Sequence, residues 1–181
     1  MKRLSILLIL IVFYSPYIFS QRGIPFFIFS EDKCFLKIAS TISKKVQKNI
    51  DILVYDIVFL NAKEDEMSEV IKNFMLILTT QQYVYDYTIK NINETIETEP
   101  NIDYSFIKNM YERDLINFGR FIKVDAVMIS SATILENKTK IVWDANSKKF
   151  TKKRVALYQG NIINCENGSS LLRVTDYFLT D

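Results

Sequence analysis

The sequence predicts an α/β fold, in which one small domain combines a mixed sheet with helices packed against it, preceded by an export signal. Three observations carry this prediction. Apolar residues recur at helical spacing in the first two thirds of the chain, a nearly continuous apolar segment lies between two such stretches, and the last part alternates between apolar and polar residues. The length of 181 residues and the 49% of hydrophobic residues fit a single globular domain.

The first residues have the order of a secretory signal peptide. Lys2 and Arg3 precede the apolar run 4–13, which is too short to span a bilayer because spanning needs about 20 apolar residues. We therefore expect a signal peptide at 1–20 and the folded domain at 21–181. An uncleaved anchor is the alternative, because the residue two places before the expected cleavage point is large. No cysteine lies near the end of this segment, so no lipid anchor is expected there.

The first element of the domain is expected to be a helix that starts at Ser30. Ser30 can cap the helix, and the acids Glu31 and Asp32 would lie at the positive end of its dipole. The apolar positions at helical spacing are Phe35, Ile38, Ala39, Ile42 and Val46. The following segment, 50–60, is rich in Val, Ile and Tyr and predicts a strand buried on both faces at the centre of the sheet.

A second helix is predicted directly after the polar loop 61–66. Its apolar positions are Val70, Ile71, Phe74, Ile77 and Leu78. A short strand is expected at 83–88. A third helix is then expected at 104–123, although Gly119 weakens its last turns.

The last part of the chain predicts an antiparallel meander. Strands are expected at 126–129, 139–145 and 155–162, with turns at 135–138 and 146–149. The helical connections between the earlier strands require parallel neighbours. The expected sheet is therefore mixed and five-stranded, in the order second, first, third, fourth and fifth strand.

Charge and composition exclude several classes of function. The formal charge of +2 comes from Lys2 and Arg3, so the chain after the leader is neutral overall and no nucleic-acid partner is expected. The basic run 148–154 is interpreted as a solvated hairpin. The chain has no histidine, which removes the commonest general base and metal ligand. We therefore expect no enzyme, no cofactor and no metal site.

Carboxylates are the remaining candidates for catalysis. Asp51 and Asp56 interrupt the first strand. Nothing in the sequence pairs them at a catalytic separation, so we interpret both carboxylates as structural hydrogen-bonding groups. The charge run 112–114 is interpreted as a solvated helix face. A small secreted hydrolase that works through carboxylates is the less favoured alternative.

The two cysteines, Cys34 and Cys165, have two interpretations. In an oxidising compartment, a disulfide between them would stabilise the fold by about 4 kcal/mol in the chain-entropy model. The other interpretation is two separately buried thiols that act as small apolar side chains. The sequence leaves both open.

Aromatic residues provide the candidate interface. Tyr83, Tyr85 and Tyr87 recur with period two and would share one face of a strand. Tyrosine anchors protein interfaces well, so this face could bind a partner, and packing under a helix is the alternative. Trp143 alternates with core positions and is expected in the core or at the edge of an interface.

The order of these elements resembles that of the CsgG, FlgO and TolB amino-terminal group of bacterial envelope domains. The segments that carry the resemblance, within residues 34–162, are KNIDILVYDIVFLN, EMSEVIKNFMLILTTQQYVYDY and LINFGRFIKVDAVMISSATILENKTKIVWDANSKKFTKKRVALYQGNI. The resemblance implies an envelope location, periplasmic or outer-membrane-associated. It also implies a role in binding or assembly rather than in catalysis.

The expected function is therefore that of an exported, non-enzymatic accessory module of the cell envelope. Its partner would be an envelope protein, reached through an exposed strand edge or an aromatic face. Once the leader is cleaved, any contact with a membrane would be peripheral. A self-assembling structural subunit, built through an exposed sheet edge into a homo-oligomer, is the second hypothesis.

Overall fold

The computed structural model of the protein describes residues 28–46, 49–55, 57–62, 64–84, 87–92, 95, 112–144 and 147–180. Within them the chain forms one domain with three helices and a curled mixed sheet of seven strands. The helices are α2 (Glu31–Lys45), α3 (Glu64–Gln81) and α5 (Glu112–Phe121). The strands are β1 (Phe29–Ser30), β2 (Ile50–Val54), β3 (Val58–Leu60), β4 (Tyr87–Asn91), β5 (Ala126–Asp144), β6 (Lys149–Asn164) and β7 (Ser170–Thr180). The predicted fold class is confirmed, and the expected leader, 1–20, lies outside the described residues.

The sheet combines a parallel and an antiparallel part. Its order is β1-β7-β6-β5-β2-β4, and β3 pairs with β5 as well. β2 is parallel to β4 and β5, whereas β5, β6 and β7 are antiparallel to one another in turn. The predicted arrangement of the first three strands, with the first between the second and the third, is confirmed by the order β4-β2-β5.

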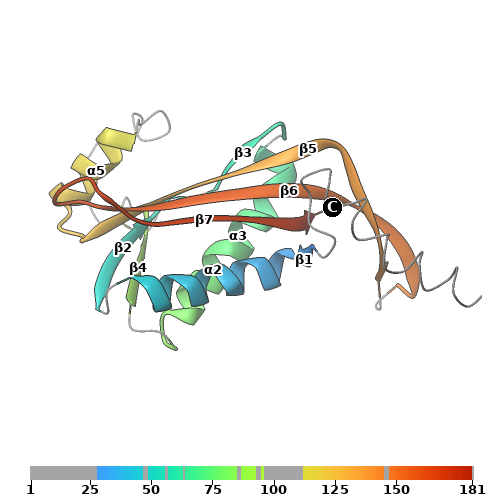
Figure 1. Ribbon diagram of the computed structural model, residues 1–181, viewed down its shortest axis with the longest axis horizontal. Helices are drawn as coiled ribbons and strands as arrows, with labels where there is room; N and C mark the ends of the chain where they lie inside the picture. Colours follow the sequence, from blue (N-terminus) through green and yellow to red (C-terminus); the bar gives the residue numbers. More distant parts are fainter. Residues whose placement is uncertain are drawn as a thin grey trace, which may run out of the picture.

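Two helices cover one face of the sheet, which we call the inner face. α2 and α3 lie side by side beneath it (Figure 1). Phe35 of α2, Phe74 of α3 and the strand residues Tyr158 and Phe178 are all fully buried there. The ring centroid of Phe35 lies 5.1 Å from that of Phe74 and 5.5 Å from that of Phe178. Because aromatic pairs add to the free energy gained by burial, this cluster holds both helices on the inner face.

The third helix, α5, packs on the opposite, outer face of the sheet. Successive strand residues point to opposite faces, so Ile52 and Val54 of β2 join the main core while Leu53 joins a second cluster. The buried residues of this second cluster are Leu53, Ile92, Phe118, Val124, Val127, Ile163 and Cys165. The core is therefore divided by the sheet into a large inner part and a small outer part.

A glycine allows α5 to approach the sheet closely. A β-carbon at Gly119 would lie 2.6 Å from the sulfur of Cys165 and 2.8 Å from a methyl carbon of Val127. The next residue, Arg120, donates hydrogen bonds to the backbone carbonyls of Cys165 and Glu166, the latter at 3.0 Å. Gly119 lowers the helix propensity of α5, but the close packing of α5 on the sheet requires a residue without a side chain at this position.

β5 and β6 extend beyond the other strands as a two-stranded arm, residues 138–154. β7 pairs with β6 only as far as Arg154, and the β5–β6 register shifts between Ile134 and Thr139. Asn137, within the shift, has a φ of 57°, which asparagine tolerates better than most residues. In Figure 1 the far ends of β5 and β6 bend away from the rest of the sheet.

The carboxyl-terminal strands differ from the prediction. The expected strands 126–129 and 139–145 form the single strand β5, and the expected turn 135–138 is the register shift inside it. The expected strand 50–60 is two strands, β2 and β3, which pair with successive parts of β5. β1 and β7 were not predicted.

The helix boundaries are closer to the prediction. α2 begins directly after Ser30 as expected, although the Ser30 side chain makes no capping hydrogen bond. α3 begins within the expected loop 61–66, and α5 coincides with part of the expected helix 104–123. The part of that helix at 104–111 lies outside the described residues.

Candidate interaction surfaces

The arm presents an apolar face to solvent. Trp143 lies opposite Phe150, and Ile141 lies opposite Lys152, so the four side chains share one face of the two strands. The rings of Trp143 and Phe150 meet edge to face with centroids 5.1 Å apart. The exposed fractions are 56% for Trp143, 72% for Phe150 and 74% for Ile141. Trp143, expected in the core or at an interface edge, therefore lies on an exposed surface.

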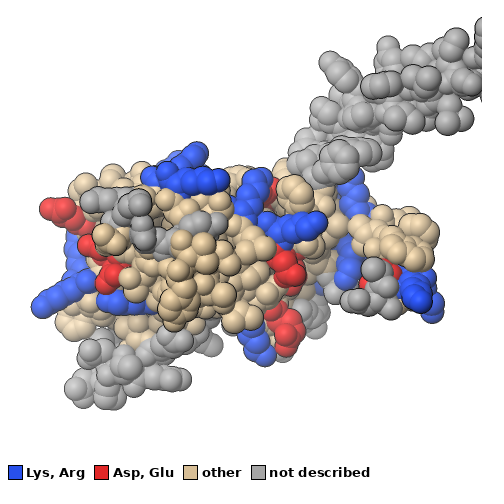
Figure 2. All heavy atoms as spheres, turned by 90° about the horizontal axis from the view of Figure 1, so that it is seen from below, with Lys and Arg blue, Asp and Glu red and all other residues tan. Residues whose placement is uncertain are grey.

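Exposed lysines lie on both faces of the arm: Lys152 is on the apolar face, and Lys149, which neighbours Phe150, is on the opposite one. Lys148 and Lys149 lie at and next to the turn of the arm, and both are exposed, as is Lys152. Figure 2 shows basic side chains on either side of an uncharged lobe at the arm end of the molecule. The interpretation of the basic run 148–154 as a solvated hairpin is confirmed for these three lysines.

A second surface lies on the outer face of the sheet, beyond the part that α5 covers. The strand register places eight side chains in two rows across β3, β5, β6 and β7. One row is Val58, Ser131, Gln159 and Thr175, and the other is Leu60, Thr133, Leu157 and Tyr177. We call these eight residues the outer grid. None of them is fully buried, and the apolar side chains of Val58 and Leu60 are 53% and 49% exposed.

The opposite side of the same strands is sealed. Ala132, Ala156, Tyr158 and Phe178 point to the inner face and have no exposed surface. The Tyr158 hydroxyl is satisfied there by the Ser130 hydroxyl at 2.8 Å, and burial raises the pKa of Tyr158 well above its ordinary value. The outer grid is thus the side of these strands that solvent or a partner can reach.

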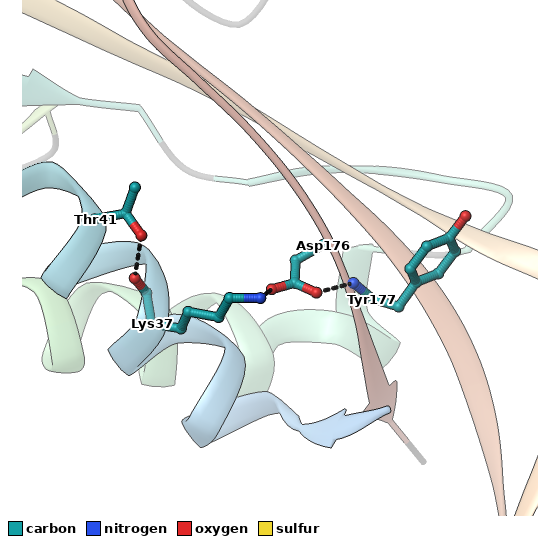
Figure 3. Close-up of polar contacts among 4 residues, drawn as sticks. All are labelled: Lys37, Thr41, Asp176 and Tyr177. Carbon is teal, nitrogen blue, oxygen red and sulfur yellow. Dashed lines mark hydrogen bonds and ion pairs between the residues drawn. The ribbon is translucent and has the colours of Figure 1, made fainter. Parts of the chain in front are cut away.

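An ion pair joins α2 to β7 across the inner face (Figure 3). The Lys37 ammonium donates to the Asp176 carboxylate at 2.6 Å, and the other carboxylate oxygen accepts the backbone N–H of Tyr177 at 2.9 Å. The Lys37 side chain is 58% exposed, so we assign this pair a modest structural role.

The two cysteines are free thiols in separate clusters. Cys34 is a buried residue of α2 in the main core, and Cys165 lies in the second cluster on the outer face. Burial raises the pKa of Cys34 to about 12, with the Asp176 carboxylate contributing, and burial raises that of Cys165 to about 11. A disulfide between them is not part of this structure, because the sheet separates the two sulfurs. The interpretation as two buried thiols describes the structure.

The three tyrosines do not form a common face among the described residues. Tyr83 lies in the turn after α3 and is 87% exposed, whereas Tyr87 is the first residue of β4 and is buried. Tyr85 lies outside the described residues. The prediction of a shared face is wrong for Tyr83 and Tyr87, because α3 extends to Gln81 and the strand starts only after the turn.

The acidic residue Asp51, a sequence candidate, makes structural contacts. Asp51 forms an ion pair with Lys90 at 3.2 Å, and its backbone N–H donates to the Asp125 carboxylate at 2.9 Å. Residues 112–114 are exposed on α5, as expected. Asp56 lies outside the described residues. Among the described residues, the Cys, Asp and Glu side chains include no group of three that could hold a metal ion.

The sequence does not predict the outer grid, because it does not indicate two of the four strands, β3 and β7, as separate strands. β3 was assigned to the first strand, and β7 was not predicted. The alternation of Leu172, Val174 and Phe178 with Arg173, Thr175 and Tyr177 is the signal that could have revealed β7.

Comparison with solved structures shows which proteins share this fold. The carboxyl-terminal domain of LpoB from Escherichia coli superposes with a TM-score of 0.57 at 11% identity, over 82% of this chain and 98% of that one. The same domain from Salmonella enterica gives 0.55 at 14% identity, over 79% and 93%. A solution structure of Escherichia coli LpoB gives 0.52 at 12% identity, over 81% and 66%.

The sequence comparisons found no relative. No protein-family model and no curated protein matches the chain. Among the described residues, no helix is both long and apolar enough to cross a membrane. The chain thus has the fold of LpoB-like domains, and its finer resemblance to CsgG and FlgO stays a hypothesis.

Proposed function

We propose that this protein is an exported, non-enzymatic accessory module of the bacterial cell envelope, and that it binds an envelope protein through the outer grid. The fold supports this proposal, because LpoB-like domains belong to the bacterial envelope. The order of charged, apolar and small residues at 1–20 supports export.

The observation that carries the proposal is the contrast between the two sides of the same strands. The inner side is closed by α2 and α3, whereas the outer grid offers Val58, Leu60, Leu157 and Tyr177 without full burial. None of its eight residues carries a charge at neutral pH, although 24% of the chain is charged. Depletion of charge around apolar and aromatic side chains is typical of the centre of a protein interface.

β3 adds a second means of binding. It contributes three residues and lies beside β5, away from the main path of the sheet. In contrast, β4 ends the sheet with part of its edge occupied, because the Gln82 side chain accepts the Ile89 backbone N–H at 2.9 Å. An extended partner segment would therefore pair more readily with β3 than with β4.

A site-specific crosslink in cells tests the proposal. A photoreactive amino acid replaces Leu60, and a control replaces Leu36 of α2, which is 42% exposed and so comparably accessible. We expect Leu60 to capture one envelope protein that Leu36 does not, and Leu157→Lys to abolish that capture. Equal products from both positions would contradict the proposal. A product made only of two copies of this chain would support the self-assembling subunit instead.

A further inference from the structure

The charge of this protein is segregated between the arm and the rest of the chain. Residues 138–154 hold seven of the 23 basic residues and one of the 21 acidic residues. The arm is therefore +6, and the remainder of the chain is −4. The small net charge of +2 thus conceals a strongly cationic arm on an anionic body, and such a field orients the molecule toward anionic partners.

The arm combines this charge with apolar side chains at its far end. One cross-strand pair, Asp144 and Lys149, separates the pair Trp143 and Phe150 from the turn. Ile141 lies on the same face as Trp143, two residues farther from the turn. Lys152 lies on the same face, Lys149 points from the opposite face of the arm, and Lys148 lies in the turn; all three are exposed. Aromatic rings at headgroup depth with lysines reaching lipid phosphates are the combination that holds peripheral proteins at a bilayer surface.

The shape of the arm favours a lipid surface over a protein partner. A stable protein interface needs about 800 Å² on each side, usually from a broad surface. The arm is two strands wide and projects at one end of the molecule (Figure 1), and its exposed apolar residues are Ile141, Trp143 and Phe150. A bilayer accepts such a narrow apolar projection without a complementary surface, and its anionic headgroups match the lysines.

We propose that the arm docks on an anionic lipid surface, with Trp143, Phe150 and Ile141 entering the interfacial layer and Lys148, Lys149 and Lys152 contacting phosphate groups. The inference does not depend on the partner of the outer grid. The arm holds the module on the membrane, and the grid on the body remains available to a protein.

The chain provides its own probe, because Trp143 is its single tryptophan. The full chain is titrated with vesicles of phosphatidylcholine alone or mixed with phosphatidylglycerol, and Trp143 emission is followed. Because every variant carries the same leader, differences between variants report the arm. With anionic vesicles we expect a blue shift, quenching by brominated acyl chains, and binding at least tenfold tighter than to phosphatidylcholine.

A matched pair of charge reversals separates the arm from general electrostatics. Lys149→Glu with Lys152→Glu should weaken anionic vesicle binding by about thirtyfold or more, since each lysine near such a surface contributes substantially. Lys44→Glu with Lys45→Glu, in the last turn of α2, which lies at the end of the molecule away from the arm (Figure 1), should change it less than threefold. Phe150→Ser should reduce the blue shift while circular dichroism stays unchanged.

Two results would overturn the lipid proposal. One is Trp143 emission that neither shifts nor quenches with anionic vesicles, and the other is equal weakening by the two charge reversals. If the first result is accompanied by a shift with acidic polypeptide, the arm is assigned to a protein instead. None of these results affects crosslinking at Leu60. The lipid proposal for the arm and the protein-binding proposal for the outer grid are therefore tested independently.

Discussion

At the residue scale, the inner face combines buried apolar side chains with two paired polar groups and one protonated thiol. Tyr158 shares its hydrogen bond with Ser130, and Asp176 binds Lys37. Cys34 lies among them with no exposed surface, and burial raises its pKa to about 12. The thiolate is the nucleophilic form, so Cys34 is inert in the folded protein.

This raised pKa predicts a pH dependence of stability. The ordinary pKa of the thiol is 9.0, so above that pH the unfolded chain releases a proton that the folded protein retains up to about pH 12. The contribution of Cys34 is therefore complete below pH 9 and declines as the pH rises toward 12. Urea unfolding at pH 7.5 and pH 10.5 should show a larger loss of stability for the wild type than for Cys34→Ala. Equal losses in both would contradict the burial of this thiol.

At the element scale, the contact between α5 and the sheet depends on the absence of a side chain at Gly119. We expect Gly119→Ala to destabilise the protein by about 1–2 kcal/mol, because strain against Cys165 and Val127 exceeds the gain in helix propensity. Chemical denaturation measures this change. Cys165→Ala in the same chain should reduce the effect of Gly119→Ala, and Arg113→Ala on the exposed side of α5 should cost less than about 0.5 kcal/mol. Stabilisation by Gly119→Ala would refute the close approach.

The element scale also shows what the sequence could predict. Helical periodicity located α2 and α3 well because each has one continuous buried face. The apolar segment 50–60 indicated the central position of β2, but its division into β2 and β3 depends on pairing with two parts of β5, which no local pattern reveals. The polar residues at 135–138 looked like a turn, whereas cross-strand pairing with β6 resumes beyond them.

The interaction surfaces could be predicted less completely than the fold. The sequence indicates Trp143 and the lysines near it as candidate residues. It does not show that Trp143 is exposed, because this exposure follows from β3 and β7 ending before the arm begins. The outer grid is formed by residues from four strands, so its uncharged character appears only after the register is known.

At the scale of the whole molecule, the sheet separates a closed side from a reachable one. α2 and α3 fill the inner face, α5 covers one end of the outer face, and the outer grid and the arm are left for other molecules. The two proposals assign one surface to each kind of partner: the uncharged outer grid on the body to a protein, and the cationic arm to an anionic lipid surface.

Cysteine accessibility in the native envelope tests this account most directly, because both natural thiols are buried and should not react with maleimide. One variant carries Thr175→Cys in the outer grid, and the control carries Lys44→Cys on α2; both positions are exposed. In the purified protein we expect both to be labelled quickly. In intact envelopes we expect Thr175→Cys to be protected at least tenfold while Lys44→Cys still reacts. Labelling of the two at equal rates in envelopes would contradict the proposed role of the outer grid.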